Sequence, residues 1–342
     1  MSRRTDLDWV RAVSILGVVL SHSSSLFVSR PSRLAFLGVT PALLCNQVPR
    51  FNIPVFFLLS GLGLCLSRRP LKLPGFWLRR LWKVGVPYVL WTVFYFLAAS
   101  DFDFSTLLAP GAFAALGRNC LTGGAAPHLW FIPVMLQFYL LYPGLKWLMD
   151  RAPLWTLLGA FLLTLFCTLL LYIPLPLTGW WRPYLWELFP TWLFFFVLGM
   201  AIDEKKLDRL RDFARKRALP LVLLAAAGAL LYTWDALRSG NLDSIKPQQF
   251  IYGPLCFLGL LAAWKWLEGK RGAVVPSGYL SRHSMAIYFS HVFFIQRLRR
   301  TDFFNQNLLT MLLVFLIALC LSLVLAALPE LWSRFRKRRK TA

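Results

Sequence analysis

Long apolar blocks, separated by short polar intervals, constrain this sequence more than any other feature. Each block is about 17 to 23 residues long, the length at which an α-helix crosses roughly 30 Å of hydrocarbon. The blocks predict an all-α polytopic membrane protein, a bundle of about ten transmembrane helices. We expect the crossings at residues 10–28, 49–66, 82–100, 129–148, 154–174, 185–202, 218–235, 249–267, 279–298 and 307–328. A further stretch, 104–121, is able to dip into the membrane without crossing it.

The composition excludes an ordinary soluble domain. Hydrophobic residues make up 58% of the 342 residues and charged residues only 15%, whereas soluble domains are about half apolar and about a quarter charged. The first apolar block is full length and no small-residue cleavage site follows it, so we expect it to be retained as a helix. The expected organisation is one transmembrane domain, 1–330, followed by a basic cytoplasmic tail, 331–342.

The formal charge of +23 invites a comparison with nucleic-acid-binding proteins. The distribution of that charge argues against nucleic acid as a partner. If the N-terminus is cytoplasmic, most of the Lys and Arg residues fall on the cytoplasmic side, in clusters at 68–83, 205–217 and 334–340. This asymmetry is the positive-inside pattern, and an even number of crossings returns the C-terminus to the cytoplasm. Some of these charges are also suited to contact anionic headgroups of membrane lipids.

The six cysteines are scattered and lack the CxxC spacing of a metal framework, so no metal site is expected. Cys45 and Cys120 both fall in outward segments. They are able to pair if that compartment is oxidising, and they stay free if it is not.

Polar residues on the first predicted helix form its most informative pattern, because such groups are costly inside a membrane and often functional. Arg11 and His22 are eleven residues apart, which places them about 20° apart around the helix and roughly 16 Å apart along it. Ser14, Ser21 and Ser25 fall on the same face. Two interpretations stay open. The polar stripe has a function, or Arg11 only anchors the inner end of the helix and His22 only caps its outer end. Asp8 is placed to hold the Arg11 guanidinium.

Two later helices carry weaker versions of this pattern. Ser284, Tyr288 and His291 share one face of the ninth predicted helix. The fourth begins at His128 and carries Gln137 at mid-depth. Each histidine has a plain structural interpretation beside the functional one.

These residue types suit acyl transfer. A neutral histidine is the natural base for removing a proton from a hydroxyl group. Coenzyme A is a cytoplasmic acyl carrier with several phosphate groups, so a protein that binds it is expected to have Arg and Lys at the inner face. Arg79, Arg80 and Lys83 stand at that edge, and Arg11 opens onto it.

Five motifs, taken in order along the chain, resemble those of the acyltransferase-3 family of membrane O-acyltransferases. The first contains a basic residue, ten intervening residues and a histidine, here Arg11 and His22. The motifs read LDWVRAVSILGVVLSH, FNIPVFFLLSG, WLRRLWKVGVPYVLW, HLWFIPVMLQFYLLYP and SMAIYFSH. The resemblance runs from residue 6 to about 295.

This resemblance implies transfer of an acyl group, usually acetyl, from cytoplasmic acyl-CoA to a hydroxyl of an envelope carbohydrate or glycolipid, in a bacterial inner membrane. Acyl-CoA is then a co-substrate, and no permanently bound cofactor is expected. His22 would be the catalytic base, and Arg11 would position the donor. The supporting residues carried over with the matching helices, together with the polar residues noted above, are Ser60, His128, Trp130, Gln137, Tyr288 and His291.

The sequence departs from the family pattern at the inner loop. An Arg-x-x-Arg element of the family stands here as Arg80-x-x-Lys83. Lysine lacks the planar fork of arginine, so two-point contact with phosphate is not expected from it. Arg79 or Arg69 is available to compensate.

Other functions remain open at this stage. A transporter or flippase for a sugar or lipid-linked sugar would use intramembrane Arg and His along a path, but neither an inverted repeat nor a pair of broken helices is visible. A membrane acyltransferase of another family would pair a histidine with an asparagine, for which Asn52 and Asn119 are available. A structural assembly factor is the third alternative.

Overall fold

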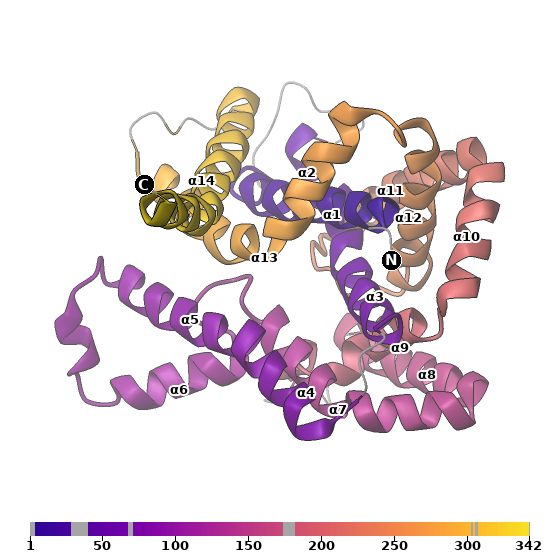
Figure 1. Cartoon of the computed structure of the whole chain (residues 1–342), viewed down its shortest axis with the longest axis horizontal. Coiled ribbons are helices and arrows are strands. Elements are labelled where there is room, and N and C mark those ends of the chain that lie inside the picture. The colour runs from indigo at the N-terminus through magenta and orange to yellow at the C-terminus, as the bar shows by residue number, and fades with distance from the viewer. Residues whose placement is uncertain are drawn as a thin grey trace. The chain divides into compact units, whose positions relative to one another are not determined.

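The computed structural model describes residues 4–28, 40–67, 71–173, 182–301, 304 and 307–341, and within those ranges every regular element is helical (Figure 1). Five helical stretches are long and apolar enough to cross a membrane. They are Pro41–Cys65, Leu73–Ala99, Pro153–Tyr172, Ala218–Ser239 and Leu308–Ser333. The chain is therefore an integral membrane protein with an all-α fold.

Each of the ten predicted crossings overlaps an α-helix, but in 185–202 only Leu193–Met200 is α-helical, and the bounds of the first crossing differ from those of its helix. The first helix, α1, spans Thr5–Ser24 rather than 10–28. It starts early because Asp6 and Asp8 occupy its first turn, where negative charge suits the helix dipole. The 104–121 stretch forms only a 3-10 turn, Phe104–Leu107, and the short helix α6, Ala112–Thr122.

The chain divides into two compact units. Unit 1 comprises Met1–Asn52, Arg211–Leu242 and Ile251–Ala342, and unit 2 comprises Ile53–Leu210 and Asp243–Phe250.

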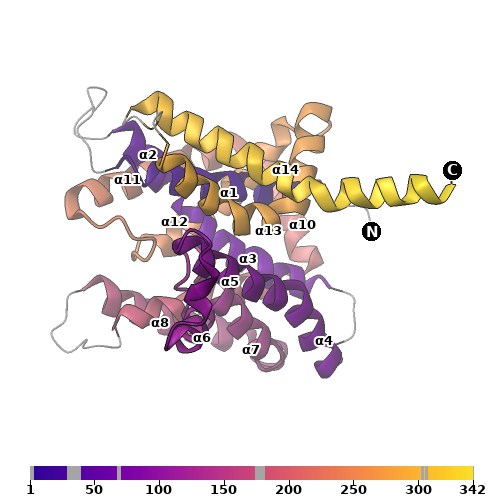
Figure 2. The ribbon, with the colours of Figure 1, turned by 90° about the vertical axis from the view of Figure 1, so that its left-hand side faces the viewer.

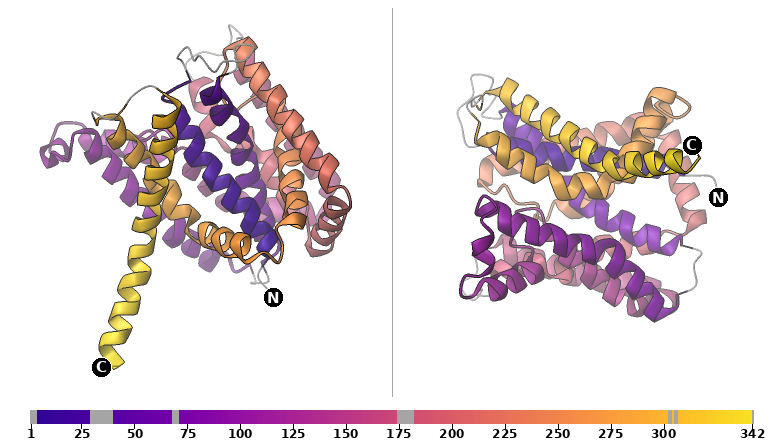
Figure 3. Two further views of the ribbon diagram at one scale, coloured as in Figure 1. Left: turned by 90° about the horizontal axis from the view of Figure 1, so that it is seen from above. Right: turned by 60° about the vertical axis from the view of Figure 1, so that its left-hand side comes forward.

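Unit 1 is built around α1. Helix α1 packs along α13, Arg271–Arg299, and α13 packs in turn along α14, Leu308–Thr341 (Figure 2). Helix α14 continues to Thr341 without a break (Figure 3). The remaining elements are α2, Pro41–Gln47; the 3-10 turn η1, Val48–Phe51; α11, Ala218–Ser239; and α12, Gln249–Ala263. Thr40 caps α2 by accepting the Leu43 N–H, and Pro41 occupies its first position.

Ionic and polar contacts fix the starting end of α1 in unit 1. Buried Asp6 lies 3.8 Å from Arg211, and the Arg211 guanidinium lies 3.7 Å from Glu268. Asp8 accepts a 2.6 Å hydrogen bond from the Ser281 hydroxyl on α13. Trp9 donates its indole N–H to the Leu260 carbonyl on α12. These contacts set the rotation of α1, and with it the direction in which the polar face points.

Unit 2 holds a core rich in aromatic side chains. Its helices are α3, Asn52–Cys65; α4, Leu73–Arg80; α5, Val86–Ala99; α6; α7, Phe131–Arg151; α8, Pro153–Tyr172; and α9, Leu193–Met200, followed by α10, Glu204–Lys216, which ends in unit 1. Phe138 and Phe196 stack with ring centroids 4.4 Å apart, and Phe57 packs against both Phe138 and Trp192. Short 3-10 turns, Arg182–Glu187 and Phe189–Trp192, lead into α9.

A close helix crossing holds α3 against α9. A Cβ atom added at Gly61 would lie 2.1 Å from the Phe196 carbonyl oxygen, and one added at Gly199 would lie 2.0 Å from that of Leu58. Only glycine fits at either position, as in other tight contacts between membrane helices. The Ser60-Gly61 pair of the second motif is thus explained in part by packing.

Helices α4 and α5 are joined by a π-helical turn, Leu81–Gly85. Pro87 lacks a backbone N–H, so the carbonyl of Lys83 loses its ordinary α-helical partner. A wider turn is the usual response to such a break. This turn sets the direction of the Lys83 side chain relative to the arginines of α4.

Candidate functional site

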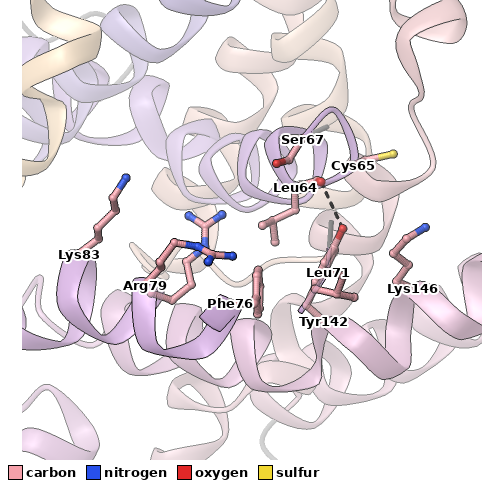
Figure 4. Close-up of a pocket in the computed structure, with 10 residues that line it drawn as sticks. Leu64, Cys65, Ser67, Leu71, Phe76, Arg79, Lys83, Tyr142 and Lys146 are labelled. Atoms are coloured by element: carbon pink, nitrogen blue, oxygen red, sulfur yellow. Dashed lines mark hydrogen bonds between the residues drawn. The ribbon is translucent and has the colours of Figure 1, made fainter. Parts of the chain in front are cut away.

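Residues toward the C-terminal ends of α3, α4 and α7 line a cavity of about 370 Å³ in unit 2 (Figure 4). Its lining residues are Leu64, Cys65, Ser67, Leu71, Phe76, Arg79, Arg80, Lys83, Tyr142 and Lys146. Four of these ten carry a positive charge and none carries a negative one. The cavity is therefore suited to an anionic ligand.

Three of the four cations come from one short segment of chain. Arg79 and Arg80 end α4 and Lys83 lies in the π-helical turn, so the fold gathers these three predicted donor-binding residues at one cavity. Within the chain ranges that the structure describes, they form no ion pair. Lys146, from α7, differs because both carboxylate oxygens of Asp150 lie 2.9 Å from its ammonium group. Arg69 lies outside the described residues.

Aromatic rings form one wall of the cavity. Phe76 and Tyr142 stack with their centroids 5.4 Å apart, and Tyr142 donates to the Leu64 carbonyl at 3.2 Å (Figure 4). The Arg80 guanidinium lies over the rings of Phe76 and Tyr139, 5.5 and 4.9 Å from their centroids. Such contacts hold a guanidinium flat and directed. The site thus combines an oriented planar cation, exposed cations and an aromatic wall.

The sequence analysis missed Phe76, Tyr142 and Lys146 as members of this cavity. Tyr142 and Lys146 are one turn apart near the end of the fourth predicted crossing, and this end was expected on the same side as the Arg79–Lys83 segment. Their expected position on the same side as Arg79 and Lys83 could therefore have indicated that they belong to the cavity. The pairing of Lys146 with Asp150 also follows from their i, i+4 spacing.

A second cluster lies in unit 1, where α1 and α13 bring His22 and His291 together. The two imidazole centroids are 5.2 Å apart, with the rings inclined by 56°. His291 is fully buried and its Nδ1 lies 2.9 Å from the Ile287 carbonyl oxygen. A carbonyl only accepts, so Nδ1 carries the hydrogen when His291 is neutral, and Nε2 is its basic nitrogen. His22 is partly exposed, so it is the more accessible member of the pair.

The rest of the predicted stripe on α1 is less polar than the sequence suggests. Ser14 is fully buried and donates to the Val10 carbonyl, while Ser25 donates to the His22 carbonyl. Both hydroxyl groups are thus used inside their own helix, as is common for helical serines. Arg11 is partly exposed on α1. Tyr288 lies close to His291, with centroids 6.3 Å apart.

Polar residues of α2 and η1 are bonded to the backbone of Ser21, the residue before His22, and to one another, and they were not among the residues predicted from the sequence. Asn46 donates its side-chain N–H to the Ser21 carbonyl at 2.9 Å, and Arg50 donates to Asn46 Oδ1 at 2.9 Å. Gln47 donates to the same oxygen at 2.8 Å and to the Leu242 carbonyl at 3.2 Å. The signal available was the run NQVPR, three strongly polar residues in five at the start of an apolar block.

The other predicted support residues lie in unit 2 and make structural contacts. Gln137 donates to the Glu187 carbonyl and accepts the Phe189 N–H, so it satisfies the backbone where two 3-10 turns meet. Ser60 donates to the Phe56 carbonyl within α3. Trp130 is buried between Trp186 and Trp192, at 4.8 and 5.4 Å, and His128 lies edge-on to Tyr95 at 5.3 Å.

No group of three or more His, Cys, Asp or Glu side chains in the described ranges is placed to hold a metal ion. All six cysteines are free, Cys45 and Cys120 among them.

A helical membrane protein with a cationic cavity and a histidine pair fits the class of membrane-embedded transferases. Residues 4–328 match the family model described as an acyltransferase domain, acyltransferase 3. The chain therefore belongs to the acyltransferase-3 family and is a membrane acyltransferase, as its motifs predicted. Neither the curated proteins nor the solved structures contain a match to the chain.

Proposed function

We propose that this membrane acyltransferase moves an acyl group, in particular acetyl, from cytoplasmic acyl-CoA to a hydroxyl group of an extracytoplasmic or lipid-linked carbohydrate. The observation that carries the donor assignment is the cationic, aromatic cavity of unit 2. Coenzyme A combines phosphate groups with a planar base, and the cavity offers both kinds of partner in Arg79, Lys83 and the Phe76 ring. The acceptor assignment rests on the family resemblance of the motifs.

The chemical step is assigned to unit 1. The acceptor hydroxyl gives its proton to His22 while its oxygen attacks the thioester carbonyl carbon, and the carbonyl electron pair moves onto oxygen. The tetrahedral intermediate then collapses, the carbon–sulfur bond breaks, and the thiolate takes the proton back from His22. Arg11, about 16 Å along α1 from His22, is assigned to positioning the donor. His22 is preferred over His291 as the base because His22 is the more accessible of the two.

The proposed topology has about ten crossings with both termini cytoplasmic, in a bacterial cytoplasmic membrane. The support is the distribution of Lys and Arg, which favours the same side for 68–83, 205–217 and 334–340. A fluorescent protein fused after residue 342 should fluoresce in this topology, and alkaline phosphatase at the same place should be inactive. Active phosphatase there would contradict it.

Cys65 offers a direct test of the donor cavity, because this exposed thiol lines it. A thioether analogue of acetyl-CoA, which has no free thiol, should slow maleimide labelling of Cys65. Cys120, partly exposed on α6 outside the proposed crossings and not among the residues that line the cavity, is the matched control and should label at an unchanged rate. Each thiol is measured in a single-cysteine variant. Unchanged labelling of Cys65 at saturating analogue would contradict donor binding in this cavity.

Membership in an acyltransferase family favours acyl transfer over the transporter interpretation. Purified protein that releases coenzyme A from acetyl-CoA in the presence of an envelope glycan extract would separate the two. Mass spectrometry of envelope glycans from cells with and without the protein should then show the acyl increment that is lost.

A further inference from the structure

Building on the acyl transfer proposed above, we propose that Arg50 is a catalytic residue whose guanidinium stabilises the oxyanion formed on the thioester carbonyl, with Asn46 as its positioning residue. None of the family motifs that identified His22 assigns a role to Arg50. The inference concerns unit 1 alone, because all the residues that carry it belong to that unit.

The first support is the contrast in burial within the cluster. Asn46 is 2% exposed, and Gln47 and His291 are fully buried. Arg50 and His22 are both partly exposed. The residues proposed to position the guanidinium are thus buried, whereas His22 and Arg50, which would contact the substrate, are partly exposed.

The second support is that the direction of the Asn46 side chain is determined by its partners. Its nitrogen donates to the Ser21 carbonyl, which leaves Oδ1 as the atom that accepts from Gln47 and Arg50. A flipped amide would place an oxygen against the carbonyl and a nitrogen against two donors. Asn46 therefore ties the Arg50 guanidinium to the backbone of Ser21, the residue before His22.

The third support is electrostatic. Arg50 lies close enough to His22 for its positive charge to act on that imidazole. Arginine stays protonated at every physiological pH, so Arg50 is the permanent cation of this cluster. A guanidinium at the apolar start of a membrane-spanning stretch is costly, and such charges usually mark function.

The chemistry of the step needs such a group. As the hydroxyl oxygen attacks, negative charge develops on the thioester oxygen while His22 gains a proton. An oriented guanidinium offers N–H donors and positive charge to the developing oxyanion without having to reorganise. Removing one such donor typically lowers kcat by about 10²- to 10³-fold. By contrast, a residue that only bound the donor would change KM.

The test measures release of the coenzyme A thiol from acetyl-CoA in membrane vesicles that carry the native acceptor. Arg50→Ala should lower kcat by about 10²- to 10³-fold and leave the apparent KM for acetyl-CoA within about twofold. Guanidinium chloride at millimolar concentration should restore part of the Arg50→Ala activity, because the small cation fills the vacated space. His22→Ala is the matched control and should not respond to guanidinium.

A second variant keeps the inference testable if Arg50→Ala does not fold. Arg50→Lys keeps the charge and removes the fork, and we expect about a tenfold lower kcat at unchanged KM. Wild-type kcat in a folded Arg50→Lys or Arg50→Ala protein, or a loss confined to KM, would overturn the role of Arg50. If His22→Ala is also fully active, the proposed function fails as well, so the two failures are distinguishable.

Discussion

The cavity of unit 2 and the cluster of unit 1 formed by His22, His291, Asn46 and Arg50 differ in how their positive charges are held. In the cavity, Arg79 and Lys83 are exposed and form no ion pair in the chain segments that the structure describes. In the cluster, Arg50 is held by a buried asparagine whose own direction is fixed by two further contacts. Exposed flexible cations suit capture of an anionic ligand from water, and oriented ones suit stabilisation of charge that develops in a reaction.

This difference implies a division of labour that kinetics can test. Substitutions in the cavity should act on the apparent affinity for the donor, and substitutions in the cluster should act on turnover. Substitutions at helix crossings should act on stability alone. The largest effect is expected in the cluster and the smallest effects in the cavity.

The largest effect is expected from His22→Ala. Loss of the base should reduce turnover about 10²- to 10⁴-fold while the protein stays in the membrane and still protects Cys65 through the bound donor analogue. The loss of turnover is measured from initial rates of coenzyme A release. His283→Ala is the matched control, because His283 contacts Glu330 and Tyr279 away from the cluster. Normal turnover by the His22→Ala protein would end the assignment of this histidine.

The next effect concerns stability rather than chemistry. Gly61→Ala adds a methyl group against the Phe196 carbonyl, so α3 and α9 must separate, and we expect a loss of about 1 to 3 kcal/mol or more. Thermal unfolding in detergent, followed by helical circular dichroism, measures it. Gly63→Ala is the matched control, since a methyl group there meets open space and alanine favours the helix. Equal melting temperatures for the two variants would contradict the close crossing.

Much of unit 2's helical content could be predicted from the sequence, because a membrane-spanning helix is coded by its own composition. The ends of the helices were harder to predict from the sequence. The start of α1 depends on charges at Asp6 and Asp8, and Asp6 is fixed by a partner as distant as Arg211. A hydropathy calculation ends the apolar block at such charges and therefore places the start of the helix too late.

The candidate site was predictable where its residues were local in sequence. Arg79, Arg80 and Lys83 lie within five positions and were found together, and His22 stood out as a costly residue. Arg50 was missed because the polar run NQVPR does not show how α2 and η1 pack against α1, and that packing places Arg50 beside the histidines. Gln137 was singled out by its depth in a helix, and its contacts with backbone groups of a distant turn could not be predicted from the local sequence.

A smaller effect should follow when the support of Arg50 is removed. Asn46→Leu takes away the accepting oxygen, so the guanidinium loses its fixed direction and kcat should fall about tenfold at constant KM. Asn46→Asp keeps that acceptor and should retain more of the turnover. A loss of activity matched by an equal loss of folded protein in both variants would instead assign Asn46 to stability only.

The smallest effects are expected within the cavity, where two lysines make a matched pair. Lys83→Ala removes a charge that has no ion-pair partner in the described structure, and should raise the apparent KM for acetyl-CoA about tenfold without changing kcat. Lys146→Ala removes a charge that Asp150 already balances, so its effect should stay within about twofold. Raising the ionic strength should raise the wild-type KM and leave that of Lys83→Ala less affected, because the exposed cation is screened. Equal effects of the two lysines would show that charge balance does not govern donor capture, and a fall in kcat for Lys83→Ala would break the division between the two regions.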